Sequence, residues 1–171
     1  EYGIDGFKFD GGSVDMYTPS NIKNGEPSDD HDAIAMNIAW NDFGTSYKFH
    51  EFKDTFKGGG KNAIQRICDR GHKWDDDGIN TLIPCMIAQG LIGTPFICPD
   101  MIGGGQWTYA QDPDFNVDEE LFVRMAQASA LAPMMQFSWA PWRVVSKENY
   151  QYIVDASQLH KKMSDKIISV I

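Results

Sequence analysis

The chain has 171 residues, of which 42% are hydrophobic and 23% charged, and this predicts one globular domain with a buried core. The formal net charge of −9 argues against nucleic acid and against an anionic membrane surface as partners, because both need a basic face. No apolar run approaches the length of a membrane span. The composition leaves the cellular compartment undecided.

Residues 3–12 predict a short buried strand that ends in a carboxylate. Its apolar body is formed by Ile4, Phe7 and Phe9. Asp10 comes next, and two glycines then end the strand. Barrel enzymes place catalytic groups at such strand ends. Asp10 is equally explained as a solvated residue at an ordinary junction between strand and loop.

Lys8 lies two residues before Asp10, so the alternation of side chains along a strand should point both toward the same face. A lysine within an apolar strand is costly to bury unless it is paired. One hypothesis is therefore a structural ion pair with Asp5 or Asp10. The other is a hydrogen-bond donor to a polyhydroxylated ligand.

The rest of the chain alternates helices with short strands. The expected helices span residues 32–41, 62–70, 81–91, 118–131 and 147–164. The further expected strands span residues 49–56, where an irregular segment is the alternative, 93–100 and 134–138. Residues 17–32 are expected to form a long loop and residues 58–60 a flexible hinge.

This alternation predicts a parallel α/β arrangement. The strands before Asp10 and Asp100 both end in a carboxylate with glycines close behind, which suits a barrel whose strand ends line one pocket. A doubly wound sheet would carry a GxGxxG turn, and the sequence has none. We therefore expect residues 1–171 to form the C-terminal portion of a (β/α)8 TIM barrel.

A full barrel needs about 250 residues, and the chain opens at Glu1 within an apparent strand. We therefore expect the N-terminal strands of the barrel to be missing. Half a barrel leaves sheet edges exposed, so the piece alone is expected to be inactive and poorly stable.

Asp10 and the acidic run Asp75, Asp76 and Asp77 form the first pair of groups that could carry chemistry. Two carboxylates on either side of one bond suffice for glycoside cleavage, because one attacks and the other donates a proton. The acidic run is also explained as a solvated loop that attracts metal ions. The five tryptophans suit either sugar-stacking platforms or core packing.

Metal and cofactor sites are weakly indicated. The acidic cluster Asp29, Asp30, His31 and Asp32 resembles a hard-metal site without the EF-hand glycine and glutamate, so a solvated loop is favoured over a metal-dependent enzyme. The three cysteines have no CxxC pair and the four histidines lack zinc-ligand spacing. Cys85 and Cys98 are expected to be buried free thiols. No cofactor is predicted.

Taken in order, these segments resemble glycoside hydrolase family 31, the α-glucosidase and α-xylosidase family with a (β/α)8 catalytic barrel. The segment GFKFD resembles the nucleophile strand of the family, which implies that Asp10 is the nucleophile. The segment HKWDDD resembles the Trp-x-Gly-Asp segment, which implies that Asp77 is the acid/base. Asp76 stands where a glycine is usual, so the other aspartates of the run stay alternatives.

The resemblance also implies sugar-binding residues. The segment PFICPDMIGG resembles the Asp-Ile-Gly-Gly strand of the family, with Asp100 as a ligand of a sugar hydroxyl. Residues 119–127 resemble the helix that follows that strand. Trp74 belongs to the acid/base segment, and Arg66 is a candidate for the arginine that precedes it.

Two positions depart from the α-glucosidase pattern. Lys8 replaces the usual tryptophan and is similar to the lysine of the α-xylosidase branch. Ser138 takes the place of a sugar-binding histidine, which resembles the α-galactosidase-type branch. The resemblance implies a retaining hydrolase of terminal α-linked sugars, α-galactosidase-like or α-xylosidase-like, with a glycoside or oligosaccharide as substrate. The alternative is a degenerate barrel that binds carbohydrate without turnover.

Overall fold

The computed structural model describes residues 3–13, 33–55, 57, 60–61 and 63–171. The expected loop at residues 17–32 lies outside the described residues, and so does the acidic cluster that includes Asp29 and Asp32. Two of the three glycines in the expected hinge also lie outside them. These expectations therefore stay predictions.

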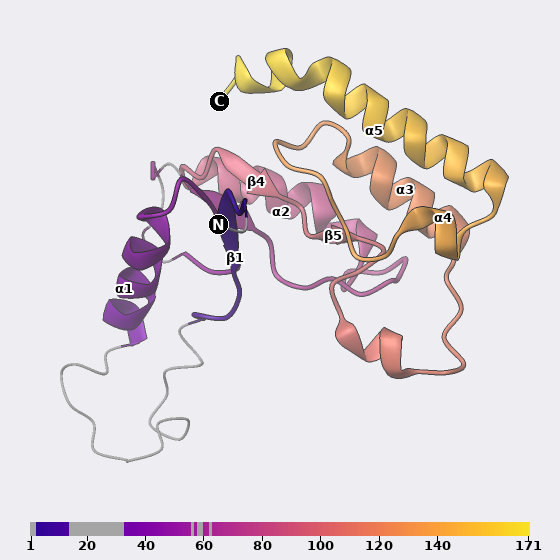
Figure 1. The fold of residues 1–171 in the computed structure, drawn as a ribbon, viewed down its shortest axis with the longest axis horizontal. Coiled ribbons are helices and arrows are strands. Elements are labelled where there is room, and N and C mark those ends of the chain that lie inside the picture. The colour runs from indigo at the N-terminus through magenta and orange to yellow at the C-terminus, as the bar shows by residue number, and fades with distance from the viewer. Residues whose placement is uncertain (1–2, 14–32, 56, 58–59, 62) are drawn as a thin grey trace.

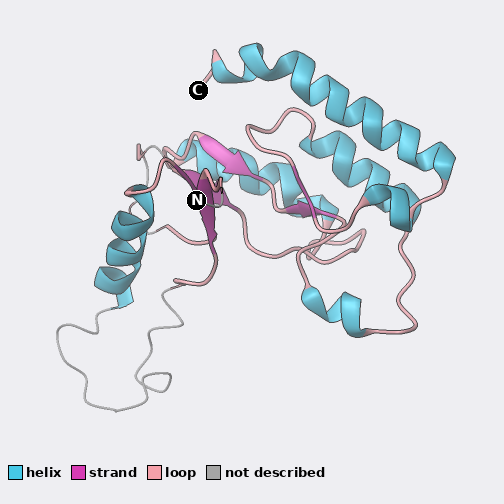
Figure 2. Cartoon of the chain, viewed as in Figure 1, coloured by secondary structure: helices cyan, strands magenta, loops and turns pink. Residues whose placement is uncertain are grey.

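Within the described residues, the strands form two sheets in which all pairings are parallel (Figure 2). The first sheet has the order β1 (Gly6–Phe9), β2 (Phe49–Phe52), β3 (Ile64–Arg66) and β4 (Phe96–Cys98). The second sheet pairs β5 (Met101–Ile102) with β6 (Gln136–Phe137). Neighbouring strands thus follow the order of the chain.

Helices connect these strands. The connecting helices are α1 (Ala33–Thr45) between β1 and β2, α2 (Leu82–Leu91) between β3 and β4, and α3 (Glu119–Ser129) between β5 and β6. The closing helices are α4 (Pro141–Val144) and α5 (Lys147–Ile168), and short 3₁₀ helices span Ile79–Thr81 and Trp107–Gln111. Figure 1 shows α1 at the left end of the molecule and α3, α4 and α5 together at the right. The parallel α/β arrangement is confirmed, and closure into a barrel stays a prediction.

The helix expected at residues 62–70 is wrong, because this stretch contains β3. Ile64 and Ile67 are spaced as on one face of a helix, which is what the sequence pattern detects. The three residues of β3 instead pair with β2 on one side and β4 on the other, and this pairing outweighs a weak helical preference. Beyond the strand, the Ile67 N–H donates to the Cys98 carbonyl at 2.9 Å.

The strand expected at residues 93–100 divides into β4 and β5. Pro99 has no N–H to continue the ladder, and Asp100 has a φ of 79°, in the left-handed region that non-glycine residues avoid. The chain leaves the first sheet here, and from Met101 it pairs with β6 instead. Asp100 therefore lies at the junction of the two sheets.

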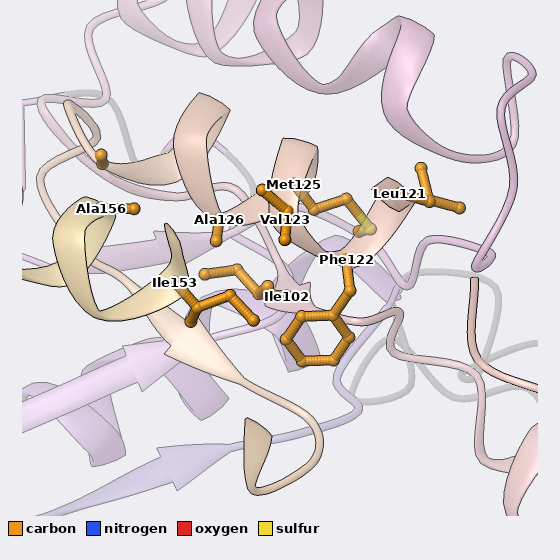
Figure 3. Close-up of a cluster of buried hydrophobic side chains, with 9 residues drawn as sticks. Ile102, Leu121, Phe122, Val123, Met125, Ala126, Ile153 and Ala156 are labelled. Carbon is orange, nitrogen blue, oxygen red and sulfur yellow. The ribbon is translucent and has the colours of Figure 1, made fainter. Parts of the chain in front are cut away.

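The main apolar core lies between the second sheet and the helices α3 and α5 (Figure 3). The expected helices at 118–131 and 147–164 are confirmed as α3 and α5. The Asp118 side chain caps α3 by accepting from the Leu121 N–H at 3.0 Å, which satisfies a free donor of the first turn. Leu121, Phe122 and Met125 are buried members of this core.

A second, smaller core joins β1 and β2 to α1. Phe9 and Phe52 stack with ring centroids 5.0 Å apart, and Trp40 of α1 packs edge-on against Phe9 at 5.4 Å. Trp139 packs against the main core, whereas Trp74 and Trp142 are exposed. Core packing therefore explains two of the tryptophans.

All three cysteines are free, and only Cys98 is buried, since Cys85 is half-buried and Cys68 is exposed. Burial raises the pKa of the Cys98 thiol to about 12, so this cysteine is a poor nucleophile. Among the described residues, no helix combines the length and the apolar character that crossing a membrane requires.

Candidate active site

Charged side chains gather on one face of the four-stranded sheet, toward the carboxyl ends of its strands. They are Lys8 and Asp10 from β1 and its end, Glu51 and Lys53 from β2 and its end, Arg66 from β3, and Asp100 after β4. Lys8 stands opposite Glu51 in the register of β1 and β2. Residues two apart in a strand share a face. Asp10 and Lys53 therefore form a second layer of charge beyond the layer formed by Lys8 and Glu51.

Arg66 is the centre of this cluster, and its side chain is only 1% exposed. One terminal nitrogen donates to Asp10 Oδ1 at 3.0 Å. The other donates to Asp69 Oδ1 and to Asp100 Oδ1, both at 2.8 Å. Burial by itself lowers the pKa of Arg66, but the hydrogen bonds to Asp69 and Asp100 outweigh it and hold the pKa above its usual value.

Asp10 combines a fixed position with access to solvent. Arg66 holds its Oδ1, while the side chain as a whole is 67% exposed. Within the described part of the chain, Oδ2 of Asp10 accepts no hydrogen bond. A carboxylate with one oxygen held and the other open is suited to attack on an electrophile or to binding a hydroxyl group.

Lys53 and Asp69 connect neighbouring strand ends around Asp10. Lys53 Nζ lies 2.9 Å from Asp69 Oδ2 and 4.0 Å from Asp10 Oδ1. Burial raises the pKa of Asp69, but hydrogen bonds from Arg66 and Lys53 outweigh it and lower the pKa. The hydrogen bond to Asp69 in turn raises the pKa of Lys53. These groups therefore stay charged around neutral pH.

Lys8 has a partner that the sequence did not indicate. Its ammonium lies 4.0 Å from Glu51 Oε1 and 3.5 Å from Met101 Sδ, and the side chain is 39% exposed. The structural ion pair is thus formed with Glu51, and the hypothesis of a pair with Asp5 or Asp10 is wrong. Strand register explains this, because Glu51 stands directly opposite Lys8 on β2.

Asp100 is fully enclosed, with a side chain that is 0% exposed. Its Oδ1 accepts from Arg66, and its Oδ2 accepts from the backbone N–H of Arg70 at 2.8 Å. Burial raises the pKa of Asp100, and these hydrogen bonds offset part of that effect. A Cβ added to Gly105 would lie 2.6 Å from Asp100 Oδ2, so only glycine fits beside this carboxylate.

Asp77 lies in the loop between β3 and the 3₁₀ helix Ile79–Thr81. Its exposed carboxylate pairs with Lys73 at 3.2 Å, and among the described residues no hydrogen bond or ion pair joins it to Asp10. The Asp77 carbonyl accepts from the Gly71 N–H at 2.8 Å, which closes the loop on itself. Gly78 is required in this turn, because a Cβ there would lie 1.9 Å from the Lys73 carbonyl oxygen.

Trp74 and Ser138 are also placed outside the Arg66 cluster. Trp74 is exposed, and its indole N–H donates to Asp118 Oδ2 at 2.7 Å, which ties the acidic loop to the start of α3. Ser138 follows β6, and its hydroxyl donates to the Ile102 carbonyl at 2.9 Å. The structure therefore joins Asp10 and Asp100 through Arg66, and it links Lys8 to Arg66 through Glu51. It does not join Trp74, Asp77 or Ser138 to them by a direct contact.

Three charged residues of the cluster were missed by sequence reasoning. Glu51 and Lys53 lie on either side of Phe52 in the segment FHEFK, and this spacing of two is the signal that could have placed them on one strand face. Asp69 follows β3, and the wrong assignment of residues 62–70 to a helix concealed its place at a strand end.

Comparison with known proteins supports a likeness to a glycosidase. No protein-family model matches the chain. The chain is 30% identical to the myogenesis-regulating glycosidase of Mus musculus over 151 residues, which cover 83% of this chain and 20% of that protein. It is 36% identical to the SITS-binding protein of Tetronarce californica over 96 residues, or 56% of this chain and 13% of that protein. The chain thus spans a fifth or less of the length of these relatives.

Proposed function

We propose that these residues form part of the active site of a retaining α-glycoside hydrolase of glycoside hydrolase family 31. The observation that carries the proposal is the position and environment of the Asp10 carboxylate. This carboxylate stands at the end of a parallel strand, is held through Oδ1 by a buried arginine, and belongs to a side chain that is 67% exposed. The relative named as a glycosidase supports the same reaction class.

In this proposal Asp10 Oδ2 attacks the anomeric carbon of a bound sugar while Asp77 gives its proton to the departing glycosidic oxygen. The bond between the anomeric carbon and that oxygen breaks as the bond to Asp10 forms. Asp77, now a carboxylate, then takes a proton from water, and the resulting hydroxide equivalent displaces Asp10 from the sugar. Both carboxyl groups return to their starting states.

The position of the acidic loop supports Asp77 in the second role. The loop begins at Arg70, whose backbone N–H binds Asp100 and whose carbonyl accepts from the Gly105 N–H at 2.9 Å. The loop therefore leaves the sheet at the end where Asp10 lies. Lys73 holds the Asp77 carboxylate in this structure, so the side chain must release that ion pair to serve as an acid.

The buried groups of the cluster suit positioning better than direct contact with a sugar. Arg66 and Asp100 are enclosed, and their polar atoms are used by other protein groups. We assign them to holding Asp10. The partly exposed Lys8 remains available to a sugar hydroxyl, and with Ser138 it is the basis for proposing an α-galactoside or α-xyloside as substrate.

We further propose that additional strands complete a barrel beside β1. Among the described strands, β1 pairs only with β2, and Phe7 on this strand is exposed. A cavity of about 400 Å³ beside it is lined by Phe7, Asp10, Trp40, Phe43 and Tyr47. An open parallel edge next to apolar rings is suited to a further strand and helix. The greater length of the relatives agrees with this.

A mechanism-based label tests the proposal. The complete protein in which these residues occur is incubated with 2-deoxy-2-fluoro or epoxide analogues of α-galactosides and α-xylosides, and digested for peptide mass spectrometry. The expected result is turnover of the matching nitrophenyl α-glycoside and one label on Asp10. Sugar binding without label or turnover would instead support the degenerate, carbohydrate-binding alternative.

A further inference from the structure

Glu51 is a buried carboxylate that the proposed reaction does not use. Its side chain is 2% exposed, and it lies in β2, one layer below the strand ends. An ionised carboxylate in such a place is costly unless it is paired. Its partners come from three strands: Lys8 from β1, Arg66 from β3 and Gln136 from β6.

The two oxygens of Glu51 have separate partners. Oε1 lies 3.4 Å from Arg66 Nε and 4.0 Å from Lys8 Nζ, so one oxygen faces both cations. Oε2 accepts a hydrogen bond from the Gln136 amide. Glu51 thus faces Nε of Arg66, while the terminal nitrogens of Arg66 donate to Asp10 and Asp100.

The contact with Gln136 links the two sheets. Gln136 belongs to β6, two residues before Ser138, whereas Lys8 belongs to the first sheet. Glu51 therefore bridges the strand that carries Lys8 and the strand that leads to Ser138. Met101 adds a second link, because its sulfur lies 3.5 Å from the Lys8 ammonium.

We propose that Glu51 is a positioning residue that sets the place of the Lys8 ammonium relative to Asp10 and to the second sheet, and thereby the selectivity for the sugar. This rests on the function proposed above. Glu51 acts through Lys8 and Arg66 and does not touch the reacting atoms.

The burial of Glu51 also acts on its charge. Burial raises the pKa of Glu51, and Asp100 adds to this, although Lys8, Arg66 and Gln136 work in the opposite direction. The ionised carboxylate is therefore a cost to the folded state near neutral pH. A residue that costs stability yet faces the cations of the site should show its contribution in substrate binding.

The test is a double-mutant cycle in the complete protein with Glu51→Gln, Lys8→Met and the pair. Glu51→Gln keeps the shape and removes the charge. It is expected to raise KM for the nitrophenyl glycoside by about tenfold, as for loss of a contact with a charged group, with a smaller change in kcat. Arg66 keeps Asp10, Asp69 and Asp100 as partners, so its buried charge stays compensated and the urea midpoint should not fall. Adding Lys8→Met should cost no further binding, because the two residues act as one unit.

Glu120→Gln is the matched control, since Glu120 pairs with Arg124 on the outer surface of α3 and should leave both readouts unchanged. The inference is overturned if Glu51→Gln leaves KM unchanged, if the two losses are additive, or if activity falls only in proportion to folded protein.

The reactivity of Lys8 gives an answer that does not depend on hydrolysis. Acetylation of Lys8 by acetic anhydride, followed by peptide mass spectrometry, should be about threefold or more faster in Glu51→Gln, because the ammonium has lost its carboxylate partner. An unchanged rate overturns the positioning role. If the wild-type protein hydrolyses no glycoside but Lys8 is still acetylated faster in Glu51→Gln, the proposed function is contradicted. The coupling between Glu51 and Lys8 would still stand.

Discussion

Arg66 and Asp10 form an ion pair of 3.0 Å between a fully enclosed cation and a carboxylate that is two-thirds exposed. The enclosed partner has little freedom, because its other nitrogens are held by three more carboxylates. Asp10, the exposed partner, is therefore held in a fixed position without being buried itself. This is the arrangement that preorganises a nucleophile while leaving it accessible.

Replacing Arg66 by methionine should strongly destabilise the fold. The change removes the cation and leaves the enclosed carboxylates of Glu51 and Asp100 without their main partner. Breaking a buried ion pair from one side costs about 3–5 kcal/mol in unfolding free energy. Urea denaturation followed by circular dichroism measures this loss.

The control for that prediction is Arg124→Met in α3. Arg124 pairs with Glu120 at 3.4 Å, and both side chains are mostly exposed. Such pairs contribute about 0–1 kcal/mol, so this variant should unfold close to the wild type. Equal losses in both variants would contradict a special role for the buried cluster.

The sequence predicted the parallel α/β arrangement because the longer helices carry clear periodicity and caps. In α3, a capping aspartate at position 118 precedes the buried Leu121 and Met125, and this local pattern is sufficient. β3 could not be recognised in the same way. It has three residues, and its identity as a strand comes from pairing with β2 and β4, which lie far from it in the sequence.

The candidate site was predicted in part for a similar reason. Alternation along one strand is a local signal, so the shared face of Lys8 and Asp10 could be read from residues 3–12. The partner of Lys8 depends on the register between β1 and β2, which the sequence does not contain. The burial of Asp100 likewise depends on the turn that carries the chain between the two sheets, beside Gly105.

Asp69→Asn should reduce stability at neutral pH and have little effect in acid. The contacts with Arg66 and Lys53 lower the pKa of Asp69, so the folded state binds fewer protons than the unfolded state just below the ordinary pKa. Its contribution is therefore present above about pH 4 and is lost as the pH falls through the folded pKa. For this partly exposed carboxylate we expect on the order of 1 kcal/mol.

Urea denaturation of wild type and Asp69→Asn between about pH 3 and pH 7 measures the difference directly. The difference in unfolding free energy should be constant near neutral pH and shrink in acid. A difference that grows as the pH falls would contradict the lowered pKa of Asp69 in the folded state.

Gly105→Ala should destabilise the protein, whereas Gly90→Ala should not. A Cβ at position 105 would meet Asp100 Oδ2 at 2.6 Å and push the carboxylate away from Arg70. We expect a loss of about 1–3 kcal/mol. Gly90 lies in α2 with nothing within 4 Å of its added Cβ, so alanine should gain about 0.5–1 kcal/mol there. Thermal unfolding of the two variants compares them, and a loss of stability at position 90 would contradict this account.

Under the proposed function, Asp10→Asn should abolish glycoside hydrolysis in the complete protein while the fold is retained. Asparagine keeps the shape of the side chain and can still accept from Arg66, but its amide is a poor nucleophile. We expect kcat to fall by at least about a thousandfold, with a thermal midpoint close to the wild type. Asp5→Asn is the matched control, because Asp5 is an exposed carboxylate just before the same strand and should leave kcat unchanged. Substantial hydrolysis by Asp10→Asn, or an equal loss in Asp5→Asn, would remove Asp10 from the nucleophile role.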